Sequence, residues 1–408
     1  MKEGSTSVTL QRKLLLLSPV GAITLVIVYM SYQPRTVYLP GIQTHSEHDT
    51  CPSVLKHMLS GSWATRRLVK NEEDEIEAFL LQGLYAVNGS DYFELPDKRC
   101  GNLGYYPVMS QDEMASWTRV MCDPRGSSPC CYENKCQMKT IKECMCSNCY
   151  DLRPQIHAEY SKWSPDDARC QVKTFSPNAA CELLREGTYH FYGDSIVRMV
   201  FLALIIILKG DNQYGGLRPD APIDIKKTCS GMYVFPTRNC RAFLDYSPTL
   251  CNGTVTVVFR HYPRSQDVPK MRRDVKEILE QPKSIIFFGA GAWQHFDRLD
   301  MKIYALAVIS LLQGNSRLWP QLIWSGFHSF GLWHRHIVPT SDNAHVEPFN
   351  RYMEDLVGAF NVPVFDTFNM TKGVRSVDGT HYGPGVNFVK AQIYLNYILE
   401  LKRQGKWK

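Results

Sequence analysis

Residues able to support nucleophilic chemistry stand together in the segment Tyr189–Met199. The segment begins with an aromatic, strand-forming run, continues through Gly193-Asp194-Ser195 and passes directly into a long apolar stretch of helix formers. This pattern predicts a strand, a tight turn and a helix. A serine at such a junction lies at the carboxyl end of a buried strand, where open α/β sheets place their sites. Its backbone N–H also opens the helix, so the positive end of the helix dipole lies behind a developing oxyanion.

A second group of reactive side chains lies near the end of the sequence, in Asp378-Gly-Thr-His381. A serine nucleophile needs a base to take its proton and a carboxylate to orient that base, and this loop offers both. The alternative is that Asp194 or Ser195 only caps the following helix, which is common turn chemistry. Seven other histidines compete with His381 for the role of base, and most are expected on the surface or in loops: His190, His261, His295, His328, His334, His336 and His345.

The order of the two blocks, Gly-Asp-Ser first and Asp-x-x-His last, resembles that of the SGNH (GDSL-type) hydrolases. The longer form Tyr192-Gly-Asp-Ser-x-x-Arg198 is similar to the PC-esterase branch of that group. This branch includes the neurexophilin-and-PC-esterase family and the trichome-birefringence-like polysaccharide O-acetyltransferases. The resemblance runs from about residue 170 to the end of the sequence. Three further segments also carry it: Cys181–Gly187, Phe349–Met353 and Phe365–Thr367.

The resemblance implies a role for each residue of these blocks. Ser195 would be the nucleophile, His381 the general base, and Asp378 the carboxylate that holds the imidazole. The oxyanion hole would contain the backbone N–H of Ser195, with N–H groups of Gly289 or Gly291. SGNH enzymes carry an asparagine where this sequence has Gly289, so one side-chain donor is missing, a loss that can cost roughly 10²–10³ in rate.

The sequence leaves alternatives open for a second glycine that would donate an N–H to the oxyanion, and for the residues that would contact the substrate. Gly215 and Gly231 are both candidates for that glycine. Arg198, one helical turn after Ser195, would bind a carboxylate or an acetyl oxygen of the substrate, or form an ion pair with a loop carboxylate. Trp293 would stack on a sugar ring or pack in the core.

The resemblance also implies an esterase or O-acyltransferase that moves an acyl group, expected to be acetyl, on a glycan or glycoprotein hydroxyl. The acyl group would pass through an acyl-serine to water or to a sugar hydroxyl. No metal or other cofactor is expected, and the acyl donor would be acetyl-CoA or an acetylated glycan. Two alternatives stay open: a non-catalytic binding or adhesion protein built on this fold, and a lipid or peptide hydrolase that uses the same triad.

Cysteine content indicates an oxidising compartment. The 408 residues carry a net charge of +6, with no basic stripe interleaved with aromatics, so a nucleic-acid partner is not expected. All fourteen cysteines lie between Cys51 and Cys251, seven of them within Cys122–Cys149. That segment is otherwise rich in Asp, Asn, Gly, Ser and Pro, so disulfides should replace a hydrophobic core. Zinc bound by the three cysteines of Cys144–Cys149 is the alternative.

The N-terminal region predicts a membrane anchor. Residues 14–32 are apolar over about the 20 residues that span a bilayer, with basic residues immediately before them. The positive-inside rule places residues 1–13 in the cytoplasm and the remainder in the lumen; a cleaved signal peptide is the alternative. Three sequons agree with this topology, at Asn88, Asn252 and Asn369. We therefore expect a single-pass type II membrane glycoprotein of the Golgi or the cell surface.

The chemistry-bearing blocks need elements that position them. After a polar stem at 33–50 and a cysteine-rich region at 51–169, strands and helices alternate through 170–408. This alternation predicts an α/β domain with a mostly parallel sheet covered by helices on both faces. The resemblance implies the same architecture, the three-layer α/β/α fold of SGNH hydrolases. The loop at 378–381 must then fold back onto Ser195.

Overall fold

A six-stranded mixed sheet forms the centre of the structure. The computed structural model describes residues 51–86, 100, 122–146, 149–235, 237–313, 319–332 and 343–407. The predicted anchor at 14–32, the stem and the sequon at Asn88 lie outside these ranges. Within them, no helix is both long enough and apolar enough to cross a membrane.

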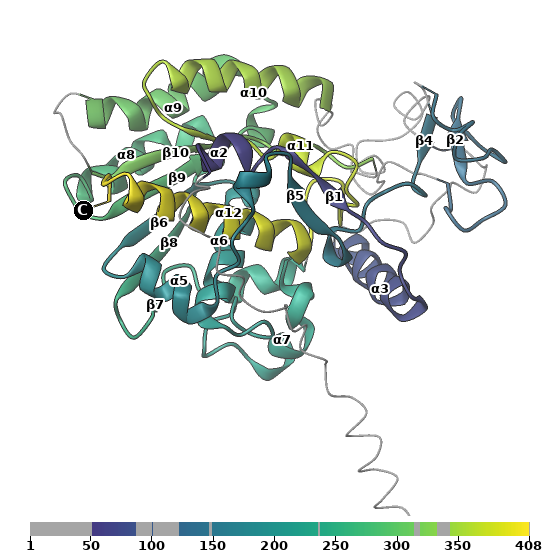
Figure 1. The fold of residues 1–408 in the computed structure, drawn as a ribbon, viewed down its shortest axis with the longest axis horizontal. Coiled ribbons are helices and arrows are strands. Elements are labelled where there is room, and N and C mark those ends of the chain that lie inside the picture. Colours follow the sequence, from purple (N-terminus) through teal and green to yellow (C-terminus); the bar gives the residue numbers. More distant parts are fainter. Residues whose placement is uncertain are drawn as a thin grey trace, which may run out of the picture. The chain divides into compact units, whose positions relative to one another are not determined.

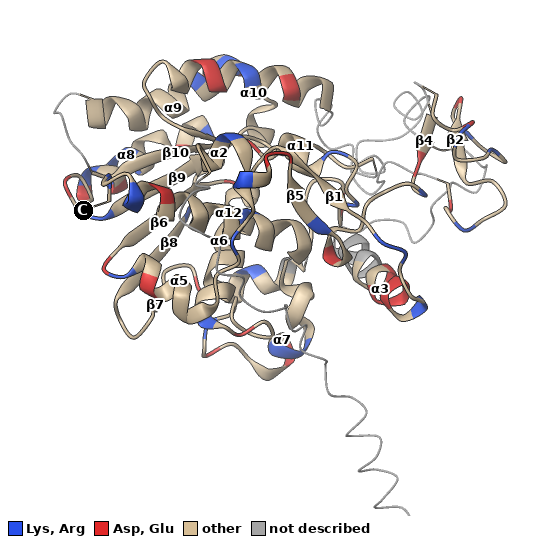
Figure 2. Ribbon diagram, viewed as in Figure 1, with Lys and Arg blue, Asp and Glu red and all other residues tan. Residues whose placement is uncertain are grey.

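The sheet has the strand order β11-β10-β9-β6-β8-β7 (Figure 1). Neighbouring strands from β11 to β8 run parallel, and β7 pairs antiparallel at the edge. The strands are β6 (Thr188–Gly193), β7 (Thr249–Leu250), β8 (Val255–His261), β9 (Ser284–Gly289), β10 (Gln321–Ser325) and β11 (Val364–Phe365). The two central strands, β6 and β9, are buried almost throughout, and Figure 2 shows the centre of the sheet nearly free of charged residues. The predicted mostly parallel sheet is confirmed.

Helices cover both faces of the sheet, which gives three layers (Figure 1). Successive side chains of a strand point to opposite faces. Phe191 therefore packs in the core beneath α6 and α12, whereas Tyr192 packs in the core beneath α9 and α10. The first face carries α5 (Pro177–Leu184), α6 (Ser195–Lys209) and α12 (Pro384–Arg403); the second carries α8 (Val268–Glu277), α9 (Arg298–Gln313) and α10 (Asn343–Gly358). The shorter helices are α2 (Val54–His57), α3 (Lys70–Ala86), α7 (Ile223–Thr228) and α11 (Phe368–Thr371).

An antiparallel ribbon joins the N-terminal part of the described chain to the sheet domain. It pairs β1 (Gly61–Ala64) with β5 (Lys162–Pro165), with the rings of Trp63 and Trp163 edge to face at 5.4 Å. Trp63 Nε1 donates to the carbonyl oxygen of Met370 at 2.7 Å. The described residues from Cys51 onward accordingly belong to one compact unit. The boundary at 169/170 stays a prediction.

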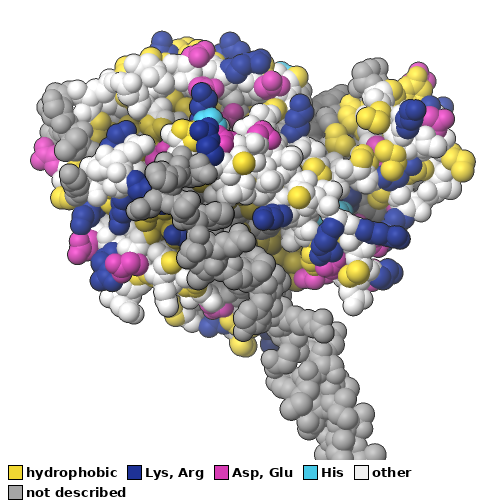
Figure 3. Space-filling model, viewed as in Figure 1, with side chains coloured by type: hydrophobic (Ala, Val, Ile, Leu, Met, Phe, Trp, Pro, Cys, Tyr) yellow, Lys and Arg dark blue, Asp and Glu magenta, His cyan; other side chains and the backbone are white. Residues whose placement is uncertain are grey.

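The cysteine-rich region contains a small sheet of order β3-β2-β4, which Figure 3 shows with several exposed hydrophobic side chains. Its strands are β2 (Cys130–Tyr132), β3 (Lys135–Gln137) and β4 (Cys149–Asp151). The buried cluster here consists of cysteines 100, 122 and 131, while Met138 and Met145 are exposed. The sulfur atoms therefore stand in for an apolar core, as the composition predicts.

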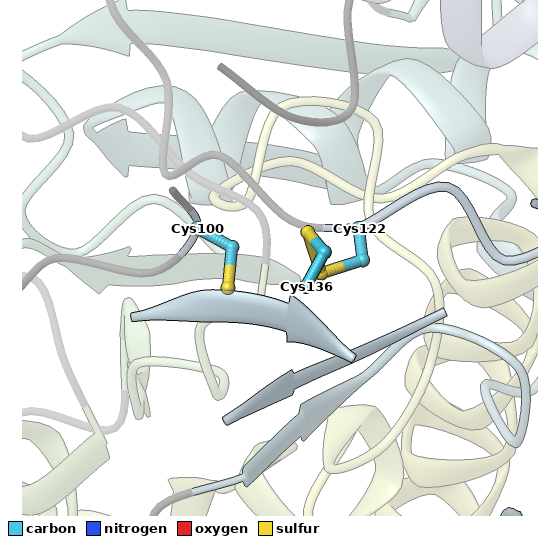
Figure 4. Close-up of side chains that lie close together, drawn as sticks. All are labelled: Cys100, Cys122 and Cys136. Atoms are coloured by element: carbon cyan, nitrogen blue, oxygen red, sulfur yellow. A yellow bond between two sulfur atoms is a disulfide. The ribbon is translucent and has the colours of Figure 1, made fainter. Parts of the chain in front are cut away.

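All fourteen cysteines form disulfides, which confirms the disulfide prediction. The pairs are Cys51–Cys170, Cys100–Cys131, Cys122–Cys136, Cys130–Cys144, Cys146–Cys149, Cys181–Cys251 and Cys229–Cys240. Figure 4 shows three sulfur atoms close enough to one another to share a metal ion, those of Cys100, Cys122 and Cys136. Because each of them is bonded to another sulfur, none offers the thiolate that zinc requires.

Candidate active site

Ser195 is the first residue of α6 and directly follows the turn that ends β6. Asp194 is the N-cap, and its Oδ1 accepts a hydrogen bond from the N–H of Ile196 at 2.9 Å. Gly193 lies opposite Gly289 in the β6–β9 ladder, and a Cβ at Gly193 would overlap the carbonyl oxygen of Gly289. The turn therefore requires glycine at this close approach of two strands.

The side chain of Asp378 organises the loop that carries it. Its Oδ1 accepts hydrogen bonds from the N–H groups of Thr380, at 3.0 Å, and His381, at 2.7 Å. Gly379 between them has φ +81°, a left-handed conformation that suits glycine. The N–H of Val377 donates to the carbonyl oxygen of His381 at 2.7 Å and closes the loop.

The loop and the helix terminus meet in one hydrogen-bonded chain. His381 Nε2 lies 2.8 Å from Ser195 Oγ, and His381 Nδ1 lies 2.7 Å from Asp378 Oδ2. The helix-capping alternative is correct for Asp194, whose carboxyl group caps α6. It does not account for Ser195, whose hydroxyl contacts the imidazole 186 positions along the chain.

Two carboxyl groups of the site have opposite electrostatic environments. Burial alone would raise the pKa of Asp378, but the charge and hydrogen bonds of His381, with the Thr380 N–H, outweigh burial and lower it to about 2. Asp378 is therefore ionised at neutral pH and can stabilise an imidazolium. In contrast, burial raises the pKa of Asp194 to about 6, against the opposing hydrogen bond from Ile196.

Gly289 ends β9 opposite Gly193, in the turn before Ser195, and the structure explains why no asparagine stands there. A Cβ at Gly289 would lie 2.5 Å from the carbonyl oxygen of Ser325 on β10. No larger side chain fits without moving a neighbouring strand. Gly291 follows at the N-cap of a 3₁₀ turn, where its carbonyl oxygen accepts from the N–H of Gln294.

The two other candidate glycines use their N–H groups within their own loop. Gly215 N–H donates to the carbonyl oxygen of Asp211, and Gly231 N–H donates to that of Gln213, each at 2.9 Å. In this conformation neither N–H is available to an oxyanion.

The two candidate substrate contacts differ in exposure. Arg198 is buried, with 6% of its surface exposed, and its Nη2 has no hydrogen-bond partner within the described ranges. Burial, and then the positive charge of Arg241, lower the Arg198 pKa to about 10, so the group stays charged at neutral pH. Trp293 is half exposed, and the guanidinium of Arg264 lies 4.8 Å from its ring centroid.

The two described sequons are accessible. Asn252 and Asn369 are both exposed, as a glycan acceptor must be. Their glycosylation stays a prediction.

Contrary to the expectation for most of the competing histidines, His190 lies on β6 and is 5% exposed, so it is neither at the surface nor in a loop. His328 lies in the loop after β10, as expected, but is only 1% exposed. His334 and His336 lie outside the described residues. His328 Nε2 contacts the carbonyl oxygen of Thr380, the residue before His381, and its Nδ1 contacts Lys390. One feature of the sequence could have pointed to His328 as a residue of the site: it follows the end of a strand, as Ser195 does. Lys390 lies within a helix, α12, and nothing in the neighbouring sequence points to it.

Comparison with known proteins finds no matching family model and no similar curated protein. Among solved structures, the chain is similar to a G-D-S-L family lipolytic protein from Veillonella parvula, at 14% identity and a TM-score of 0.31, over 51% of this chain and 96% of that one. It is similar to a lipase/acylhydrolase from Enterococcus faecalis at 16% identity and a TM-score of 0.29, over 54% and 96%. It is also similar to an acetylxylan esterase from Geobacillus stearothermophilus at 14% identity and a TM-score of 0.30, over 52% and 96%.

Proposed function

We propose that this protein is a serine acyl esterase or O-acyltransferase that removes or transfers an acyl group, expected to be acetyl, on glycan hydroxyls. The observation that carries the proposal is the hydrogen-bonded chain from Ser195 Oγ through His381 to the ionised Asp378. This arrangement activates a hydroxyl as a nucleophile toward an acyl carbonyl.

In the first half-reaction, Ser195 Oγ attacks the carbonyl carbon of the acyl donor while His381 Nε2 takes the hydroxyl proton. Asp378 accepts a hydrogen bond from His381 Nδ1–H, which leaves Nε2 free to act as the base, and stabilises the imidazolium that forms. The imidazolium then gives its proton to the departing oxygen or sulfur of the donor, and an acyl-serine is left.

In the second half-reaction, an incoming hydroxyl gives its proton to His381 and attacks the acyl-serine. Water in this role makes the protein an esterase, and a sugar hydroxyl makes it a transferase. Ser195 Oγ recovers its proton from His381, which restores the starting state. Nothing in this sequence of steps requires a bound cofactor.

The oxyanion would be stabilised mainly by the start of α6. The backbone N–H of Ser195 lies in the first turn of a 15-residue helix, whose dipole favours negative charge there. Gly289 supplies no side-chain amide, and this absence is what favours the alternative of a non-catalytic binding protein. Covalent labelling of Ser195 distinguishes the two.

We place Arg198 in the substrate site because a buried, charged guanidinium with an unpaired Nη2 lies one turn after the nucleophile. A carboxylate or carbonyl oxygen of the substrate would satisfy that donor. Arg198→Gln keeps polar volume but loses the charge and the forked donors, so we expect KM to rise roughly tenfold with little change in kcat. Steady-state kinetics on an acetylated glycan measures both. An unchanged KM would remove Arg198 from the site.

Disulfide formation supports a lumenal or extracellular location for the described part of the chain. With the predicted anchor at 14–32, we propose a single-pass type II membrane protein of the Golgi or cell surface that acts on glycans or glycoproteins.

The decisive experiment uses the purified full-length chain and a fluorophosphonate probe, followed by acetyl release from acetylated glycans. We expect the wild type to be labelled, and Ser195→Ala to lose labelling and at least about 10³-fold in acetyl release. Ser310→Ala, which changes an exposed serine on α9, is the matched control. Folded wild-type protein that neither reacts with the probe nor releases acetate would overturn the proposal and leave the binding protein.

A further inference from the structure

A buried histidine lies under the loop that carries the proposed base. His328 follows β10 and is 1% exposed, and its Nε2 lies 2.5 Å from the carbonyl oxygen of Thr380. Because a carbonyl oxygen can only accept, Nε2 must carry the proton. The bond therefore fixes the tautomer of His328 and holds the peptide group between Thr380 and His381.

A buried lysine completes this arrangement from the opposite side. Lys390 lies on α12 and is 1% exposed, and its Nζ lies 3.0 Å from His328 Nδ1. With the proton on Nε2, the Nδ1 of a neutral ring accepts, so the lysine donates. A protonated ring would turn a second N–H toward the amine; accordingly, burial and then the charge of Lys390 lower the His328 pKa well below its ordinary value.

Stability alone does not account for a lysine at this position. Within the described ranges no carboxylate lies at ion-pair distance from Lys390 Nζ, and burial lowers its pKa to about 7, against the raising effect of Asp366. A buried amine with no carboxylate to pair with its charge lowers the stability of the folded state. Both its charged and its neutral form keep an N–H to donate to His328, so the contact persists through titration.

We propose that Lys390 and His328 are positioning residues that hold the His381 imidazole at the distance and angle required for proton transfer from Ser195. The hydrogen bonds from Asp378 act within the loop and set its internal shape. The bond from His328 joins the loop to two other elements, the segment after β10 and α12. Tyr382, next to the base, packs edge-on against the His328 ring at 4.9 Å. This inference rests on the proposed acyl transfer at Ser195.

Two amide variants of His328 test the direction of the bond. The amide nitrogen of His328→Gln occupies the place of Nε2 and can still donate to Thr380, whereas that of His328→Asn is too short. We expect His328→Asn and Lys390→Met to lower kcat about 10- to 100-fold, because small displacements of a base are that costly. KM should stay within about twofold, since neither residue faces substrate, and His328→Gln should recover most of the loss.

Asn396→Ala is the matched control for a purely structural effect. Asn396 lies on the same helix, is buried, and donates to the carbonyl oxygens of Lys173 and Gln392. We expect this variant to lower the unfolding temperature at least as much as Lys390→Met while kcat stays at the wild-type value. Equal kcat for the Gln and Asn variants of His328, wild-type kcat in Lys390→Met, or losses that simply follow the unfolding temperatures would each overturn the inference.

A measurement independent of activity separates this inference from the proposed function. In ¹⁵N-histidine NMR spectra of the full chain, His328 should show a proton on Nε2, and Lys390→Met should shift its Nδ1 resonance. A proton on Nδ1 overturns the inference even if Ser195 reacts with the probe. An inactive wild type with the expected His328 spectrum overturns the proposed function, and the positioning role falls with it.

Discussion

At the scale of single residues, Asp194 is a buried carboxyl group immediately before Ser195, the proposed nucleophile. Its Oδ1 caps α6, while Oδ2 has no hydrogen-bond partner within the described ranges. Burial raises its pKa from 3.8 to about 6. The pKa of Asp194 is higher in the folded state than in the unfolded state. Its contribution to the free energy of unfolding is therefore most favourable below about pH 4 and is lost as the pH rises through about 6.

We predict that Asp194→Asn stabilises the protein at neutral pH. The asparagine oxygen can still cap α6, but no charge has to be buried. The variant should unfold with up to about 3 kcal/mol more free energy than the wild type at pH 7, and with an equal value below about pH 4. Chemical denaturation across this range measures the difference. Asp211→Asn, at an exposed aspartate whose Oδ1 also accepts two backbone N–H groups, is the control, and it should not stabilise the protein at pH 7 because no buried charge is removed.

The residues that meet at the site differ in whether the neighbouring sequence reveals them. Ser195 could be predicted because a strand, a tight turn and a helix follow one another around it, and Asp378 and His381 because they share one loop. The arrangement of His328 and Lys390 could not be predicted, because their contact joins residues 62 positions apart. Arg198 could be singled out by helical spacing, but its burial depends on the elements packed over it.

At the scale of elements, the close approach of three strands decides what the end of β9 can carry. Gly193 and Gly289 face each other across β6 and β9, and Gly289 also abuts Ser325 of β10. Parallel strands bring their carboxyl ends to one edge, so a side chain added to one strand end displaces the next. This strand spacing therefore leaves no room for an asparagine side chain at Gly289.

Gly289→Asn tests this strand spacing, because it introduces a side-chain amide where the sequence has none. We expect it to destabilise the protein by about 1–3 kcal/mol through overpacking and to lower acetyl release. Thermal unfolding and kinetics measure the two effects. Gly358→Asn, where an added Cβ meets no atom within 4 Å, is the control and should unfold close to the wild-type temperature. A higher kcat with an unchanged unfolding temperature in Gly289→Asn would show that the strands can move apart.

The elements of the sheet domain could largely be predicted, and their ends could not. The strand β6 and the helix from Ser195 appear where the pattern places them. By contrast, α10 runs from Asn343 to Gly358 and contains Pro348 in its interior. A proline is normally found in the first turn of a helix, so the sequence would place the start of α10 too late. The β1–β5 ribbon could not be predicted, because four-residue strands about 100 positions apart carry no shared local pattern.

At the scale of the whole molecule, one disulfide joins the start of the described chain to the sheet domain. Cys51 and Cys170 are 119 positions apart, so their bond restricts the unfolded chain far more than the bond Cys229–Cys240 does, with a separation of 11. The β1–β5 ribbon lies within the segment between these two cysteines.

We predict that replacing Cys51 and Cys170 by serine lowers the free energy of unfolding by about 4–5 kcal/mol, against about 3 kcal/mol for the Cys229/Cys240 pair, because loop-closure entropy grows with loop length. Probe labelling of Ser195 at low temperature should persist in the first variant, since neither cysteine contacts the triad. Denaturant titration of both double variants makes the comparison. A larger loss from the shorter loop would show that native packing, and not chain entropy, sets the effect.

The 186 positions between Ser195 and His381 have a consequence while the protein is being made. A ribosome-bound chain that has exposed Ser195, the proposed nucleophile, still lacks His381, the proposed base, and about 190 further residues take on the order of ten seconds or more to synthesise. Throughout that interval the serine is an ordinary alcohol beside whatever acylated sugars and cofactors surround it. With the proposed roles of Ser195 and His381, their separation along the chain would keep the hydroxyl unreactive until most of the sheet domain has been synthesised.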